Sequence, residues 1–366
     1  MEITASMVKE LREMTGAGMM DCKKALAETD GNMEEARDYL RKKGQAKAEK
    51  KAARIAAEGL CRIAEEGDTV AVVEVNSETD FVAKNDMFKD YVAAVAAQAL
   101  KSNAADIDGL MAEKWNLDES KTVSEALVDK IAVIGEKLSI RRFTKVQGGV
   151  IGTYTHGGGK ICVIVQLESD VDNEAIREMA HNLGIQIAVL NPQYVSRNDI
   201  SAEEVAHLRD VTVDAALNDP ASLPKPILNK LIETAKAEKK WSDEDIKNFE
   251  EHKDKMQYVF NFMTKEAPVA LAELAFADKA NILADKIFGG MIEGRISKQY
   301  NEICLLDQVY VKAEDGKQTV GKFIEQVAKE NGAKITVKSF VRYETGEGIE
   351  KKEENFAEEV AKQMNA

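Results

Sequence analysis

The sequence is poor in the residues that build metal sites and covalent catalysis. It has only four cysteines and four histidines in 366 residues, with no CxxC pair, no HExxH motif and no other ligand spacing. A zinc site, a redox pair or a metal enzyme would need such spacings. We therefore expect no metal, no cofactor and four buried or idle thiols. The residues in question are Cys22, Cys61, Cys162, Cys304, His156, His181, His207 and His252.

A net positive charge and long apolar runs are also lacking. The formal net charge of −14 repels phosphate backbones, which argues against direct binding of nucleic acid. No window approaches the roughly 18 apolar residues of a membrane span, and the start, MEITASMVKELR, is charged where a secretory signal would be apolar. We expect a cytoplasmic protein without a membrane partner. Its length favours two or three domains, and its 44% apolar and 31% charged residues are typical of folded chains.

The N-terminal residues 1–54 are expected to form a small module of three helices. Apolar residues recur there at helical spacing, and Asn32 followed by Glu35 is a capping signature. The polar, alanine-rich and basic residues 42–59 predict a solvated linker or an exposed helix. The three helices are expected around residues 7–11, at 21–28, and from Asn32 to near Gly44.

The next part of the chain predicts an α+β core with an internal repeat. Thr69–Val75 is short and rich in β-branched residues, as buried strands are, and a helical stretch follows at 88–100. Strands at 150–155 and 160–167 and a helix at 174–190 repeat this order. We therefore predict two related hairpin-plus-helix subdomains, with hairpin turns at 65–68 and 156–159.

All five prolines lie between Pro192 and Pro268, which separates this stretch from the core. Ser201 with Glu204 and Ser242 with Asp245 predict helix starts, so we expect a helical, coiled-coil-like insertion. Trp241 is expected to anchor a hinge, or else to face a partner. Further elements are expected as a strand at 303–311, a helix at 319–331 stopped by Gly332, a strand at 335–343 and a helix at 355–364. The expected domains are 1–54 (helical docking module), 55–145 (first core subdomain), 146–200 with 288–345 (second core subdomain), 201–287 (helical insertion) and 346–366 (C-terminal module).

Two short segments invite a functional interpretation. Asp80 and Phe81 lie where a core strand ends, a common place for binding groups. The residues alone mildly favour Phe81 in the core and Asp80 as a helix cap, although an aromatic beside a carboxylate could instead enter a partner. Gly157-Gly158-Gly159-Lys160 lacks the spacing of a phosphate loop, and Ile161 replaces the hydroxyl that would hold Mg²⁺, which predicts a glycine-rich hairpin turn.

Longer stretches resemble the translation elongation factor Ts family. The two most specific are Leu11–Leu26 (LREMTGAGMMDCKKAL) and Glu74–Asn85 (EVNSETDFVAKN), in the expected order and spacing. Further matches are Ile134-Gly135-Glu136, Ile140-Arg141-Arg142, Tyr154-Thr155-His156-Gly157 and Arg342–Ile349. The resemblance covers residues 1 to about 200 and about 288 to 366. The insertion departs from it, because it is longer than the helical hairpin of shorter members.

The resemblance implies a nucleotide exchange factor for the GTPase elongation factor Tu. By position, the implied docking surface for that partner consists of Lys9, Arg12, Met19, Met20 and Lys23. Asp80 and Phe81 would be an intruding pair, and the segment Thr79, Asp80, Phe81 and Val82 would dislocate Mg²⁺ from the partner. Ile134, Gly135 and His156 would make further contacts. The alternatives are that Met19 and Met20 belong to a small helical core and that His156 is a solvated turn residue.

Two rival functions stay open at this point. The three-helix module is similar to ubiquitin-associated domains, so the protein could be an adaptor or a chaperone-like binder. A small-molecule enzyme has only the glycine-rich turn in its favour, and the sequence offers no nucleophile–base pair, so we expect no enzyme. The helical insertion could support a homodimer or a heterotetramer.

Overall fold

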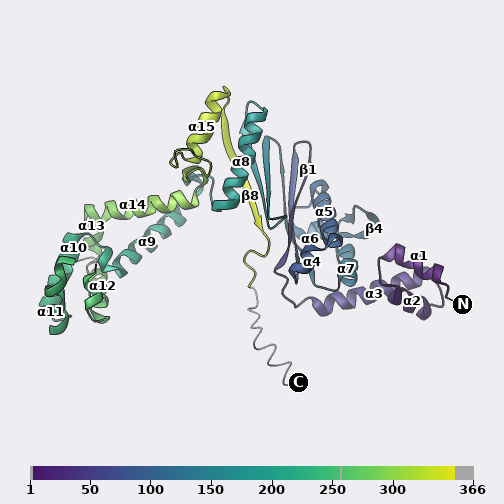
Figure 1. Cartoon of the computed structure of the whole chain (residues 1–366), viewed down its shortest axis with the longest axis horizontal. Coiled ribbons are helices and arrows are strands. Elements are labelled where there is room, and N and C mark those ends of the chain that lie inside the picture. The colour runs from purple at the N-terminus through teal and green to yellow at the C-terminus, as the bar shows by residue number, and fades with distance from the viewer. Residues whose placement is uncertain (1–2, 256–257, 351–366) are drawn as a thin grey trace, which may run out of the picture. The chain divides into compact units, whose positions relative to one another are not determined.

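Figure 1 shows the computed structural model, which describes residues 3–255 and 258–350. The chain forms two units, one made of Met1–Asn191 with Phe323–Ala366 and the other of Pro192–Lys322. No helix among the described residues is both long and apolar enough to cross a bilayer. The helix expected at 355–364 and most of the C-terminal module lie outside the described residues.

The first unit begins with three helices around a small apolar core. They are α1 (Ala5–Thr15), α2 (Met19–Glu28) and α3 (Met33–Lys51). The Asn32 side chain accepts hydrogen bonds from the backbone N–H groups of Glu34 and Glu35, so the predicted cap is confirmed. The core of the module contains Val8, Leu11, Cys22, Ala25, Leu26 and Ala36.

The predicted end of the third helix near Gly44 is wrong. Helix α3 continues for seven more residues, to Lys51, through the stretch expected to be a linker or an exposed helix. Gly44 is buried against α7 (Val123–Ile134), and a Cβ at this position would lie 3.3 Å from the Cβ of Ala132. The glycine therefore permits close helix packing here and does not stop the helix.

Two antiparallel sheets carry the core of the first unit. The first has the order β1 (Glu58–Glu66), β2 (Thr69–Ser77), β5 (Leu138–Gln147), and the second β6 (Val150–His156), β7 (Ile161–Ser169), β8 (Ile335–Glu344). Helix α5 (Asp86–Lys101) packs on the first sheet and α8 (Glu174–Leu190) on the second (Figure 1). Both hairpin-plus-helix repeats and the α+β class are thus confirmed.

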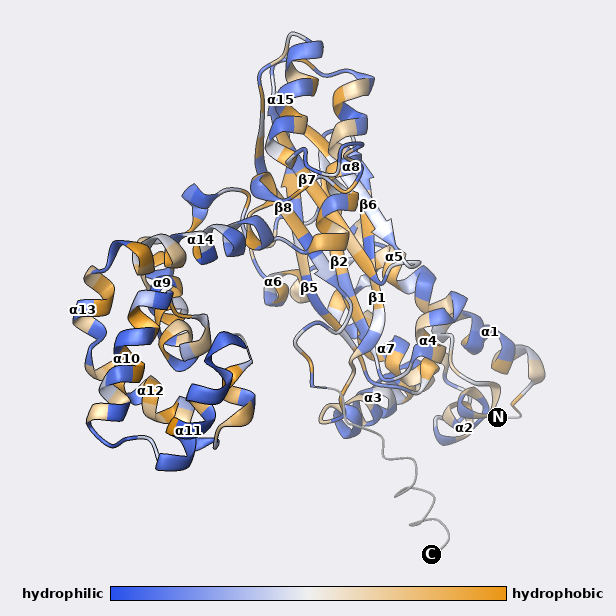
Figure 2. Ribbon diagram, turned by 60° about the vertical axis from the view of Figure 1, so that its left-hand side comes forward, coloured by the Kyte–Doolittle hydropathy of each residue, from blue (hydrophilic) through white to orange (hydrophobic). Residues whose placement is uncertain are grey.

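The two sheets share a core because their central strands are buried on both faces. In β2, Val73 and Val75 pack toward α5, while Val70 and Val72 pack with Cys162 and Ile164 of β7. A strand buried on both faces needs a continuous apolar run, and Val70–Val73 provides one, while the buried Glu74 that follows is paired with Arg141 and Arg142. The hydrophobic colour accordingly follows these strands in Figure 2, whereas α3 is largely hydrophilic.

Several elements of the first unit were not predicted. These are α6 (Ile107–Ala112), β3 (Lys114–Trp115), β4 (Asp118–Thr122), α7 and β5. Helix α7 carries a local start signal, because Thr122 and Glu125 form a capping box. Helix α15 (Val320–Glu330) and strand β8 match their predictions, and Gly332 has the positive φ of 60° that ends a helix.

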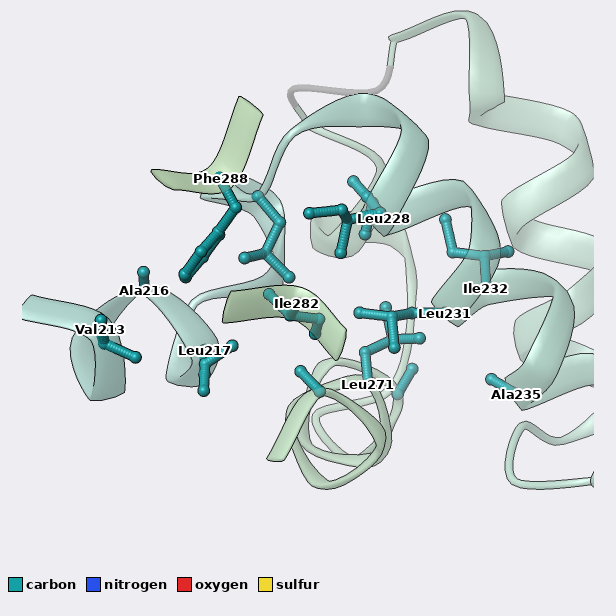
Figure 3. Packing of buried hydrophobic residues seen from close by; sticks show 14 of the residues in the cluster. Val213, Ala216, Leu217, Leu228, Leu231, Ile232, Ala235, Leu271, Ile282 and Phe288 are labelled. Atoms are coloured by element: carbon teal, nitrogen blue, oxygen red, sulfur yellow. The ribbon is translucent and has the colours of Figure 1, made fainter. Parts of the chain in front are cut away.

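The second unit is helical, as predicted. Its α-helices are α9 (Ala202–Asn218), α10 (Lys225–Ala237), α11 (Asp243–His252), α12 (Glu266–Ala277), α13 (Lys279–Ala284) and α14 (Lys286–Ile303). Short 3-10 turns occur at Arg197–Asp199, Pro220–Ser222, Lys253–Lys255, Val259–Phe262 and Leu305–Asp307. Figure 3 shows Leu231, Leu271 and Ile282, from three different helices, packed together in its core. The predicted caps at Ser201 and Ser242 are confirmed.

Two predictions for the second unit are wrong. Trp241 does not face a partner, because it is buried in this core; its Nε1–H donates to the Ala267 carbonyl at 2.9 Å and ties the connection between α10 and α11 to α12. Residues 303–311 do not form a strand: α14 extends to Ile303 and a 3-10 turn follows. Cys304, Leu305 and Tyr310 are buried there without forming a strand, whereas Val309 and Val311 are exposed. A short apolar run does not distinguish this arrangement from a strand.

Candidate functional site

The segment Thr79–Val82 lies where the central strand of the first sheet ends. Strand β2 ends at Ser77, and helix α4 (Asp80–Lys84) begins three residues later. Thr79 is the N-cap of α4, because its Oγ1 accepts a hydrogen bond from the Val82 N–H at 3.4 Å. The cap is therefore Thr79, and the expectation that Asp80 caps a helix is wrong.

Phe81 points away from the core. Its side chain is 80% exposed, whereas Val82 packs against the core of the first sheet and Ala83 is buried. The interpretation of Phe81 as a core residue is therefore wrong. Asp80 is exposed and forms an ion pair with Lys84 at 2.6 Å, which lowers the pKa of its carboxyl group.

A second loop, Ile134–Lys137, is hydrogen-bonded to this segment. Helix α7 ends at Ile134, and Gly135 follows in the left-handed conformation with φ 86°. The carboxylate of Glu136 accepts hydrogen bonds from the Thr79 N–H at 3.0 Å and the Thr79 hydroxyl at 2.6 Å. The fold thus brings Ile134 and Gly135 beside Thr79–Val82, although 57 residues separate Thr79 from Glu136. Sequence reasoning gave Glu136 no role.

The end of α3 also contacts these loops. The Lys51 ammonium donates to the Gly135 carbonyl. The Lys137 ammonium donates to the carbonyls of Ala52 and Arg54, each at 2.7 Å. Arg54 in turn pairs with Glu78 at 3.2 Å. The N-terminal module and the two loops are therefore linked through α3.

The residues expected to dock a partner lie on the surface of the N-terminal module. Met19 and Met20 are 57% and 77% exposed, so their assignment to the small helical core is wrong. Lys9, Arg12 and Lys23 are exposed too. Met14, which sequence reasoning left out, is 51% exposed on α1. Met14 lies within the LREMTGAGMM stretch that resembles the family, and this position could have identified it as a candidate docking residue. Flexible methionines beside cationic side chains suit a mixed apolar and polar protein interface.

His156 lies elsewhere in the first unit, at the end of β6. It is exposed, and its Nδ1 is 3.1 Å from the Tyr154 hydroxyl of the same strand. The following residues Gly157, Gly158 and Gly159 have φ values of 58°, 66° and 108°, which confirms the glycine-rich hairpin turn. This turn packs against β1, where the Cys61 N–H donates to the Gly159 carbonyl at 2.7 Å.

The described residues offer little for covalent chemistry. All four cysteines are free and buried, as predicted. Burial raises the pKa of Cys61 to about 12 and the pKa values of Cys162 and Cys304 to about 11, so these thiols stay protonated near neutral pH. Among residues 3–255 and 258–350, no group of three or more His, Cys, Asp or Glu side chains is arranged to hold a metal ion.

Comparisons with known proteins agree with the resemblance in sequence. The family model described as "Elongation factor TS" matches residues 78–245 and 251–347. Elongation factor Ts of Clostridioides difficile (strain 630) is 44% identical over 365 residues, covering 99% of both chains. The proteins of the same name from Clostridium novyi (strain NT) and Clostridium botulinum (strain Eklund 17B / Type B) are 40% and 41% identical, again over 99% of both chains.

Proposed function

The chain belongs to the elongation factor Ts family, and on that premise we propose that it binds elongation factor Tu·GDP and promotes GDP release during translation elongation. It acts by binding and not by covalent catalysis, in the cytoplasm. The observation that carries the mechanism is the exposure of Phe81. A large aromatic side chain that is 80% exposed, beside neighbours fixed by hydrogen bonds and packing, is suited to enter another protein.

Docking is the first step of the proposed mechanism. The exposed face of α1 and α2, with Lys9, Arg12, Met19, Met20 and Lys23, binds a helix of the partner's nucleotide-binding domain. Methionines adapt to an apolar groove, and the cationic side chains supply charge at the rim. This surface sets the affinity of the complex.

Disturbance of the nucleotide site is the second step. A GTPase holds GDP partly through Mg²⁺ and partly through backbone donors of its phosphate loop. Thr79–Val82 approaches the helices behind the Mg²⁺ site, and the Phe81 ring pushes them apart without touching the metal. Ile134 and Gly135 support the phosphate-loop side, and His156 contacts the partner near the nucleotide. The nucleotide then loses its counter-charge and leaves faster.

The energy required is modest. A thousandfold acceleration needs about 4 kcal/mol, since each ~1.4 kcal/mol is a factor of ten. Burial of one phenylalanine side chain supplies about 1.5 to 3 kcal/mol, and the surrounding interface supplies the rest. Because coupling between the two binding sites is reciprocal, rebinding of nucleotide to elongation factor Tu lowers the affinity of the factor for it, and the factor dissociates.

Stopped-flow release of fluorescent GDP from elongation factor Tu tests the proposal. The factor should accelerate release, and Phe81→Ala should lower the maximal rate about 10- to 100-fold, the equivalent of ~1.5 to 3 kcal/mol. Leu117→Ala is the matched control, because Leu117 is an apolar residue of the same unit that is 74% exposed outside these loops. Binding without acceleration by the wild-type factor would favour an adaptor instead.

A homodimer or heterotetramer through the helical insertion stays a prediction, which light scattering of the factor and its complex can test.

A further inference from the structure

Helix α4 is too short to define its own position. It has five residues, and isolated helices of this length do not form in water because nucleation is unfavourable. Its orientation must therefore come from its ends and from what it packs on. Val82 and Ala83 pack inward, but they fix only one side of the helix.

The N-terminal end of α4 is set by Glu136. Each carboxylate oxygen accepts one hydrogen bond from Thr79, Oε1 from the hydroxyl at 2.6 Å and Oε2 from the backbone N–H at 3.0 Å. A threonine hydroxyl has a single hydrogen. Once that hydrogen is donated to Glu136, the oxygen lone pairs are free to accept from the Val82 N–H. Glu136 thereby selects the hydroxyl orientation that starts the helix at Asp80.

The loops carry a second, parallel link. The Glu78 carboxylate accepts a hydrogen bond from the Lys137 N–H, and the Ser77 hydroxyl donates to the Thr79 carbonyl at 3.0 Å. The residues just before Thr79 and the residue just after Glu136 are therefore held as well. Hydrogen bonds to a carboxylate are stronger than hydrogen bonds between neutral groups. At Thr79, the two bonds to Glu136 therefore contribute more than the bond from the Ser77 hydroxyl.

We propose that Glu136 is a positioning residue for nucleotide exchange, which holds Thr79 and α4 so that Phe81 is presented outward before the partner arrives. This inference rests on the proposed function. Holding a side chain in its bound orientation reduces the entropy that is lost when the Phe81 ring enters the partner, the step that follows docking in the proposed mechanism. Glu136 acts through Phe81 and not through the docking surface, so it affects the maximal exchange rate more than the affinity.

The test measures GDP release from elongation factor Tu over a range of concentrations of the full-length factor. Glu136→Ala should lower the maximal rate about tenfold, or 1.4 kcal/mol, and leave the half-saturating concentration within about twofold. Glu136→Gln keeps one acceptor oxygen and should fall between wild type and Glu136→Ala. Glu119→Ala, an exposed glutamate of β4 in the same unit, is the control and should match wild type.

Variants at the other end of the hydrogen bond sharpen the test. Thr79→Val removes the hydroxyl at nearly constant shape and should behave as Glu136→Ala does. Thr79→Ser retains the hydroxyl and should stay close to wild type. In a Phe81→Ala background, Glu136→Ala should change the rate less than twofold, since the ring that it positions is gone. A full tenfold further loss in that background would overturn the positioning role.

Hydrogen exchange of the free factor separates this inference from the proposed function. In Glu136→Ala the backbone amides of Val82 and Ala83 should exchange at least about tenfold faster than in wild type, and in Glu119→Ala they should not. Unchanged protection would overturn the positioning role and leave the Phe81 wedge standing. If Glu136→Ala loses this protection but Phe81→Ala releases GDP at the wild-type rate, the Phe81 wedge is refuted. Glu136 would then still be the residue that orders α4.

Discussion

A buried glutamate in the first unit gives the most quantitative prediction for stability. Glu74 in β2 is 0% exposed, and its carboxylate accepts hydrogen bonds from Arg142 Nε at 2.6 Å, the Gly346 N–H at 2.8 Å, Asn76 at 3.0 Å and Arg141 at 3.1 Å. Burial opposes its ionisation, yet the Gly346 N–H, the Asn76 amide and Arg142 outweigh burial and lower its pKa. The network joins the first sheet to the residues that follow β8.

Glu74→Gln should destabilise this unit by about 3 kcal/mol. Removing one partner from a buried ion pair costs ~3 to 5 kcal/mol. The lower end applies, because Arg141 and Arg142 keep about 30% of their side-chain surface in water and stay partly hydrated. For a unit of this size the loss corresponds to a fall in Tm of about 6 to 12 °C. Glu66→Gln, on the exposed end of β1, should change stability by less than ~0.5 kcal/mol.

The two tryptophans make the measurement specific. Trp115 lies in the first unit and Trp241 in the second, so Trp241→Phe and Trp115→Phe backgrounds report the two units separately. In denaturant titrations followed by fluorescence, Glu74→Gln should shift the Trp115 transition and leave the Trp241 transition in place. An unshifted Trp115 transition, or an equal shift of both, would refute this account of the network.

The effect should also depend on pH with a defined sign. A carboxyl whose pKa is lower in the folded state contributes stability above its unfolded-state pKa, and this contribution is lost as pH falls through the folded-state value. The difference between wild type and Glu74→Gln should therefore be full at pH 7 and shrink in acid below the ordinary glutamate pKa of about 4.3. A difference that grows on acidification would contradict the stated direction.

Two further substitutions test docking and packing. Lys23→Ala should raise the half-saturating concentration for GDP release without lowering the maximal rate, and a lower rate at saturation would argue against a docking role. Gly152→Ala should cost about 1 to 3 kcal/mol in the Trp115 transition, because its Cβ would lie 2.3 Å from the Ala180 carbonyl carbon. Gly289 lies in α14, and a Cβ added at this position would have no atom within 4 Å. Gly289→Ala should therefore be neutral or stabilise the second unit by up to ~1 kcal/mol, as measured by the Trp241 transition.

Elements with local signals could be predicted from the sequence. Both hairpins have turn residues between apolar runs, and the caps at Asn32, Ser201 and Ser242 depend on residues at most three positions away. Gly44 misled the prediction because glycine ends many helices, whereas here it makes room for Ala132. That role depends on a helix almost ninety residues downstream, which no local pattern reveals.

The candidate site was predictable only through its family resemblance. The chemistry of Asp80 and Phe81 is compatible with a core or with an interface, and the choice depends on which side of α4 faces the sheet. Val82 and Ala83 take the inward side, so Phe81 faces outward. The bonds between Thr79 and Glu136 join segments 57 residues apart, and the sequence pattern of neither segment indicates the other.

The link between the N-terminal docking module and the segments Thr79–Val82 and Ile134–Lys137 depends more on packing than on charge. The ion pairs Arg41–Glu125 and Arg54–Glu78 have arginine side chains more than half exposed, and exposed pairs contribute only about 0 to 1 kcal/mol each. Close packing of α3 on α7 at Gly44 involves buried atoms, and forcing extra atoms into such a contact typically costs ~1 to 3 kcal/mol. Salt should therefore weaken the link only slightly, whereas a larger residue at position 44 would separate the module from the loop that holds Thr79.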